Sequence, residues 1–115
     1  MKRRSEKLEE CIEGCMYCQR ACLETLEYCL GRGGGHAELS HTTSLMDCAK
    51  LCEAAADLAI RGSALEPKVF ELCAAACEKC ADSCESFDDA QMKSCAETCR
   101  HCAGSCRRMA RMIHA

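Results

Sequence analysis

Residues 92–109 read MKSCAETCRHCAGSCRRM, and their cysteines and flanking methionines recur at alternating intervals of three and four residues. These intervals follow the turn of an α-helix, which places side chains three and four residues apart on one face. Charged residues such as Arg107 and Arg108 fall off this stripe and look like a solvated face. The stretch therefore predicts an amphipathic helix whose inward stripe is made of sulfur-bearing side chains.

Three other stretches carry the same kind of stripe. The unit C-x3-C-x2-C-x3-C occurs at residues 11–22, 73–84 and 95–106, while residues 48–52 hold a single C-x3-C pair. The predicted helices run from about Ser5 to Leu30, from Ser40 to Arg61, from Ser63 or Pro67 to Ser86, and from Asp88 to Ile113. The repetition indicates that all four helices share one task.

Short links separate these helices. The glycine-rich GRGGGH at residues 31–36 and the single Gly62 end the first two. Ser63 with Glu66, and Asp88 with Gln91, have the spacing of capping boxes at the starts of the last two. No strand-like alternation of period two occurs. The sequence predicts an all-α fold, an antiparallel up-down-up-down four-helix bundle with a cysteine-lined core, in one domain over residues 1–115.

The cysteines are spaced for binding a soft metal ion. Seven pairs have the CxxxC spacing, and one further cysteine stands alone. The pairs are Cys11 and Cys15, Cys18 and Cys22, Cys48 and Cys52, Cys73 and Cys77, Cys80 and Cys84, Cys95 and Cys99, and Cys102 and Cys106; the single residue is Cys29. Paired Cβ atoms on a helix lie about 5–6 Å apart, and two metal–thiolate bonds in line span about 4.5 Å. Each pair therefore predicts a clamp for Cu(I), which thiolates select and which does not require four ligands.

The antiparallel order predicts two unlike ends. Leu8, Ala59, Val69, Met109 and Ile113 would form an apolar plug at one end. The other end would gather further soft ligands, for which the candidates are Cys29, His36, His41 and Met92. His101, beside Cys102, is a weaker candidate ligand. We expect metal to enter at the end that is rich in sulfur and imidazole.

Charge balance favours many ions over one. Each metal-bound thiolate has lost its proton, so a lone Cu(I) between two thiolates leaves a buried negative charge, which is costly. Sulfurs shared between neighbouring ions bring the core toward neutrality, and the capacity is then on the order of ten ions. The sequence thus predicts storage and buffering of multiple Cu(I) ions delivered by a copper chaperone or a small thiol, with no catalytic residue.

Composition narrows the alternatives. The formal net charge of −3 gives no sign of binding to nucleic acid or to a membrane. Arg3 and Arg4 precede no apolar stretch, so we expect a cytoplasmic protein with reduced thiols. A thiol-redox protein remains an alternative, and so does a zinc or heavy-metal sequestering protein. Zinc is disfavoured because four-sulfur sites here could form only between helices.

Repeated CxxxC pairs on four successive helices, from Cys11 to Met109, resemble those of the bacterial copper storage proteins. The resemblance implies a four-helix bundle whose cysteine-lined core binds many Cu(I) ions. Without an export signal, the chain is similar to the cytosolic branch of that family, which forms homotetramers. The family also places histidine or methionine ligands near the open end, which His36, His41 and Met92 match in position.

Overall fold

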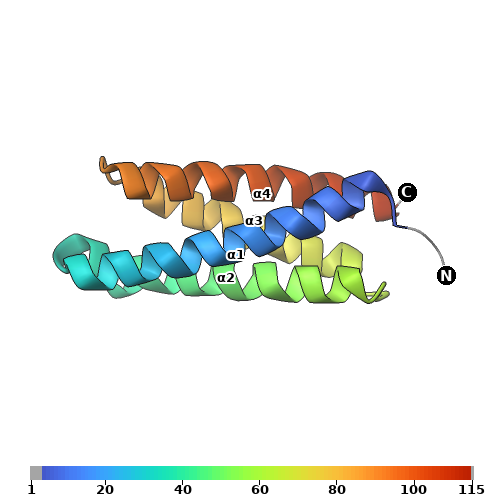
Figure 1. The fold of residues 1–115 in the computed structure, drawn as a ribbon, viewed down its shortest axis with the longest axis horizontal. Coiled ribbons are helices and arrows are strands. Elements are labelled where there is room, and N and C mark those ends of the chain that lie inside the picture. The colour runs from blue at the N-terminus through green and yellow to red at the C-terminus, as the bar shows by residue number, and fades with distance from the viewer. Residues whose placement is uncertain (1–3, 115) are drawn as a thin grey trace.

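The computed structural model describes the backbone of residues 4–114 and the side chains of residues 4–112. Four helices form an elongated antiparallel bundle of 49 × 20 × 19 Å (Figure 1). They are α1 (Glu6–Arg32), α2 (Leu39–Ile60), α3 (Glu66–Glu85) and α4 (Ala90–His114), and a short 3-10 turn, η1 (Gly34–Ala37), links the first two. The predicted all-α, up-down-up-down bundle is confirmed.

Figure 1 shows that the α1–α2 and α3–α4 connections lie at one end of the bundle, and that α1 begins and α4 finishes at the other end. This is the arrangement that the antiparallel order predicts. The helix bounds agree with the predicted ones to within two or three residues. At the start of α1, the side chain of Ser5 accepts the backbone N–H of Leu8, as an N-cap does.

The two predicted capping boxes are wrong. Ser63 Oγ accepts the backbone N–H of Leu65 at 3.1 Å, inside a tight turn that comes before α3, so it does not cap that helix. At α4 the Lys93 N–H bonds to the carbonyl of Asp89, one residue later than predicted. The Gln91 side chain donates to Thr25 on α1 instead of folding back on its own helix. A turn hydrogen bond takes the place of the cap at Ser63, and a contact with α1 takes its place at Gln91.

Cysteine and alanine fill most of the core. All fifteen cysteines are buried, and Phe70, Leu45 and Met92 are among the few bulky side chains that are fully enclosed. Ala59, Val69 and Met109 are buried at the predicted apolar end, with Leu8 packed against them. The side chain of Ile113 lies outside the described residues. None of the described helices is long and apolar enough to cross a lipid bilayer.

Candidate metal centre

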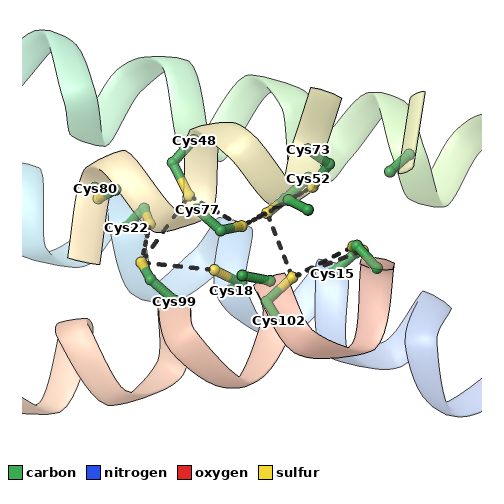
Figure 2. Packing of buried hydrophobic residues seen from close by; sticks show 14 of the residues in the cluster. Cys15, Cys18, Cys22, Cys48, Cys52, Cys73, Cys77, Cys80, Cys99 and Cys102 are labelled. Atoms are coloured by element: carbon green, nitrogen blue, oxygen red, sulfur yellow. Dashed lines mark hydrogen bonds between the residues drawn. The ribbon is translucent and has the colours of Figure 1, made fainter. Parts of the chain in front are cut away.

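The cysteine sulfurs form a column along the bundle axis, called here the thiol column. In Figure 2 the labelled side chains point from the helices toward one another in the middle of the bundle. Each cysteine is at most 2% exposed, and all are free thiols. Cysteine is small enough to let the helices approach closely, and buried thiols behave as modest hydrophobes without a metal. The column is thus both the core of the fold and its set of soft ligands.

The shortest sulfur–sulfur distances join different helices. Cys48 and Cys77 are 3.5 Å apart, and Cys15 and Cys106 are 3.6 Å apart. Within one helix the contacts are longer, as in the 4.0 Å between Cys102 and Cys106. Residues four apart on one helix are separated by about 6 Å along its axis. Cysteines on facing helices interdigitate, so their sulfurs can come closer together. The 4.0 Å contact lies within the span of about 4.5 Å that two metal–thiolate bonds in line require, so the clamp within each CxxxC pair stays a prediction. The closer contacts across the bundle add possible sites between helices.

Two seams of sulfur run along the column. One joins α1 to α4, as in the 3.8 Å between Cys22 and Cys99. The other joins α2 to α3, as in the 3.7 Å between Cys52 and Cys73. Cys52 also lies 3.9 Å from Cys102, a contact that crosses between the seams. The sulfurs are therefore continuous both along the column and across it.

Sulfurs gather in sets of four. In each such set, all four Sγ atoms lie within 4.8 Å of one another. Three sets share no member and follow one another along α1: Cys15, Cys73, Cys102 and Cys106; Cys18, Cys48, Cys52 and Cys77; and Cys22, Cys80, Cys95 and Cys99. Each draws on three helices. The four-sulfur sets therefore lie between helices, which is the only arrangement that the sequence allowed for them.

Hydrogen bonds between thiols divide the column into sulfurs that ionise more easily and sulfurs that ionise less easily. Hydrogen bonding with Cys106 and with Cys15 is the main cause that lowers the pKa of Cys102. The hydrogen bond between Cys102 and Cys106 raises the pKa of Cys106, and burial raises the pKa of Cys106 further. Each thiolate is thus stabilised by a neighbour that stays protonated. A metal cation must replace these protons before every thiolate in a set can carry its charge.

A mixed site closes the column at the end that carries the α1–α2 connection, called here the mouth. Cys29 Sγ lies 3.5 Å from His41 Nε2 and 3.6 Å from Met92 Sδ. These side chains come from the last turn of α1, the first turn of α2 and the first turn of α4. Thiolate, imidazole and thioether are all ligands that suit Cu(I). The structure brings together three of the four candidate ligands predicted for this end.

His41 is oriented as a ligand. Burial is the main cause that lowers its pKa, with a smaller contribution from His36, so the ring is neutral. Its Nδ1 lies 2.7 Å from Ser83 Oγ. Both ring nitrogens are satisfied when Nδ1–H donates to Ser83 and Nε2 accepts from the Cys29 thiol. A metal ion that displaces the thiol proton would find the Nε2 lone pair already aimed at it.

Cys29 keeps its proton in the absence of metal. Burial, followed by the negative charge of Asp89, raises the pKa of this thiol to about 11. At neutral pH the mouth therefore holds three uncharged ligands, and an incoming cation must displace one proton at Cys29.

His36 and His101 occupy different surroundings from His41. His36 Nε2 bonds to Asp89 at 2.9 Å, and its ring packs on Phe87, outside the three mouth ligands. His101 is exposed in a shallow hollow lined also by Gly14 and Tyr17, on the outer surface of α1 and α4. It follows Arg100 on the solvent side of the helix, one position off the stripe. The structure therefore does not bring His101 to the thiol column, and we no longer assign it as a ligand.

Several polar residues at the mouth were not predicted from the sequence. Ser83 orients His41, and Thr25 is fully buried beside Gln91. The Tyr28 hydroxyl on α1 donates a hydrogen bond to Asp89 in the α3–α4 connection. The position of Ser83 next to Cys84 is a weak indication in the sequence of a role at the mouth. The sequence gives no such indication for Asp89, because its partners become neighbours only in the folded bundle.

Comparison with known proteins agrees with this geometry. Residues 4–111 match the family model described as copper storage protein. The chain is similar to the Cu(I)-bound copper storage protein BsCsp3, with 31% identity, a TM-score of 0.86, and coverage of 91% of this chain and 99% of that one. The Nmul_A1745 protein of Nitrosospira multiformis is 41% identical with a TM-score of 0.89, over 93% of this chain and 97% of that one. An uncharacterized cysteine-rich protein, YhjQ of Bacillus subtilis strain 168, is 35% identical over 81 residues, which are 70% of this chain and 74% of the relative.

Proposed function

The chain belongs to the copper storage protein family, and from this premise we propose that it holds its Cu(I) ions on the sulfurs of the thiol column. The single observation that carries the assignment of ligands is the burial of all fifteen thiols in one core cluster. A buried row of soft ligands has no use in catalysis at a single centre. It suits the retention of many ions of one kind, and we assign no catalytic residue.

Charge sets the capacity of the column. One Cu(I) per thiolate makes a four-sulfur set neutral, and neutrality is what a dry core favours. The three separate sets then hold about twelve ions together. The cysteines outside these sets are Cys11, Cys29 and Cys84, and full use of them raises the limit to about fifteen ions.

The same argument separates copper from zinc. A Zn²⁺ ion in a four-thiolate set leaves two negative charges uncompensated in the core, and neighbouring sets repel one another. A closed tetrahedral set of four thiolates also holds only one zinc ion, because the four sulfurs complete the coordination of that ion. Zinc therefore fills at most the three separate sets, and it fills them less tightly than copper.

The mouth is the way in. Cys29, His41 and Met92 offer three ligands of different kinds to an ion at the end of the column. A Cu(I) ion handed over by a chaperone or a small thiol exchanges its ligands there first. Close sulfurs then lie within reach along the two seams, so that each step of transfer replaces one thiolate by the next. Burial keeps the stored ions from oxidants in solution.

We propose a cytoplasmic location, because a reducing compartment would keep these thiols available for metal. We propose that the whole chain, residues 1–115, is one copper-binding domain. We also propose a homotetramer, as the family resemblance implies. Large apolar side chains on the outer faces of the helices support such an assembly, among them Leu23, Leu30 and Leu72, each about half exposed. Native mass spectrometry of the apoprotein tests the assembly.

Competitive titration tests the proposed function. Reduced apoprotein titrated with Cu(I) against a strong chromogenic chelator should retain about twelve ions per chain before the coloured Cu(I)–chelator complex forms. A parallel zinc titration should stop at about three ions per chain. Saturation near one copper ion, or metal-free activity with cysteines oxidised in pairs, contradicts storage and favours the thiol-redox alternative.

A further inference from the structure

The three mouth ligands are closed off from solvent. Cys29 and Met92 are 0% exposed, and His41 is 4% exposed. The ring of Phe87 packs against His41 with a centroid distance of 4.8 Å, and the ring of His36 packs against Phe87 at 4.2 Å. Phe87 and His36 thus cover the ligands in two successive layers. No ion reaches Cys29 until this cover moves.

The outer layer belongs to η1, the least anchored element of the cover. This 3-10 turn contains no buried residue, and turns of this kind are short and weakly hydrogen-bonded. It begins between Gly33 and Gly34, whose φ angles of 75° and 58° lie in the left-handed region that favours glycine. An element with little buried surface opens at low cost compared with the helices around it.

One carboxylate ties η1 to the rest of the bundle. Asp89, in the α3–α4 connection, accepts a hydrogen bond from Tyr28 on α1, and its other oxygen lies 2.9 Å from His36 Nε2. Arg32 donates to the Tyr28 hydroxyl at 2.8 Å and lies 3.7 Å from Asp89. The hydrogen bonds from Tyr28 and then from His36 hold the pKa of Asp89 at about 2, so the carboxylate is charged. Hydrogen bonds to a charged acceptor are about twice as strong as neutral ones.

We propose that Asp89 is a positioning residue that latches η1 over the mouth, and that separation of His36 from Asp89 is the step that admits and releases Cu(I). The inference rests on the proposed function, because it concerns the rate of exchange at the same mouth. None of the hydrogen bonds described for Asp89 involves a mouth ligand, although its negative charge acts on the Cys29 thiol. Because Asp89 supplies no atom to the mouth ligands, its removal should change the rate of exchange and leave the number of stored ions unchanged.

The assignment gives His36 a role that differs from that of a ligand. If His36 latches the cover, its removal speeds copper exchange. If His36 binds the incoming ion, its removal slows exchange. The two roles therefore predict opposite signs for the same substitution, His36→Ala.

The experiment compares Asp89→Asn with Asp88→Asn. Asparagine is as good as aspartate at a helix N-terminus, so the start of α4 is preserved. Asp88 is exposed and adjacent, so its variant makes the same change in charge outside the latch. Stopped-flow mixing measures loading from a Cu(I)–chelator complex and release to excess chelator. Capacity is measured on the same samples.

We expect Asp89→Asn to speed both loading and release roughly tenfold. This is the change that corresponds to the loss of at least one charge-assisted hydrogen bond. Asp88→Asn should match the parent protein, and all three should hold the same number of ions. Tyr28→Phe, which removes one donor and keeps the ring, should accelerate exchange by a smaller factor. Amide hydrogen exchange at residues 35–37 should quicken in Asp89→Asn, a readout that a purely structural role in α4 would leave unchanged.

Unchanged or slower exchange in both Asp89→Asn and Tyr28→Phe overturns the latch while leaving storage intact. Reduced capacity in a folded Asp89→Asn variant also overturns it, because Asp89 would then support the binding sites themselves. Failure of the parent protein to bind more than one ion overturns the proposed function, whatever Asp89 does.

Discussion

At the scale of the residue, we propose that one set of ligands stores copper and another admits it. The cysteines in the middle of the column have other cysteine sulfurs as their hydrogen-bonding neighbours, and the shortest of these contacts join different helices. Cys29 instead has His41 and Met92 as neighbours, so an ion there has weaker and exchangeable ligands. A site of this kind controls how fast copper passes, and it adds little to how much is held.

Replacing His41 with Ala and Met92 with Leu should slow loading by roughly tenfold and lower the capacity by no more than about one ion. The reason is that the first exchange step loses two of its three ligands while the four-sulfur sets remain. Met46→Leu is the matched control, since Met46 is 45% exposed. Stopped-flow loading measures the rates, and equal rates in the double variant and the control would refute the role of the mouth.

The thiol of Cys29 also makes the stability of the apoprotein depend on pH. Its pKa is raised from 9.0 in the unfolded chain to about 11 in the fold, so its stabilising contribution is complete below pH 9 and is lost as the pH rises to 11. The fall in apoprotein Tm between these pH values should therefore be smaller in Cys29→Ser than in the parent protein. Thermal unfolding followed by circular dichroism checks this, and a larger fall in the variant would contradict the buried, protonated thiol.

At the scale of the element, the helices follow directly from the spacing of their cysteines, while the ends of the helices do not. The stripe on residues 92–109 predicts α4 and its buried face correctly, because one amphipathic period dominates the whole stretch. The capping boxes failed because Ser63 and Gln91 found partners in a turn and on another helix. The contacts between sulfurs of different helices could not be predicted from sequence alone. Spacing along a chain fixes the face of a helix but leaves open how facing stripes interdigitate.

The two cysteines of α2 are few but central. Cys48 and Cys52 both belong to one four-sulfur set and connect the two seams. Changing both to Ala should therefore remove about four ions, the content of a whole set. The control changes Cys11 and Cys84, which lie outside the three separate sets, and should lose about two ions at most.

Helicity should survive in both double variants, because each change removes only a small buried side chain. Copper titration and circular dichroism measure the two effects. Equal losses of copper in the two variants would show that the thiols act independently and that the four-sulfur sets have no meaning for binding.

At the scale of the whole molecule, one arrangement provides both the fold and the store. Four inward stripes produce a core with few bulky side chains, in which thiols stand where leucine and phenylalanine would usually pack. The apolar end closes the column with Ala59, Val69 and Met109, and the mouth closes it with rings and η1. We propose that copper reaches the column from the mouth, and the fold already holds its thiols close together.

Anomalous diffraction from crystals of the Cu(I)-loaded protein tests the central claim most directly. The account predicts copper density strung along the bundle axis, beside the three four-sulfur sets, with no change in the course of the four helices. Copper bound on the outer surface, or sulfurs joined to one another as disulfides inside a metal-free core, would contradict it.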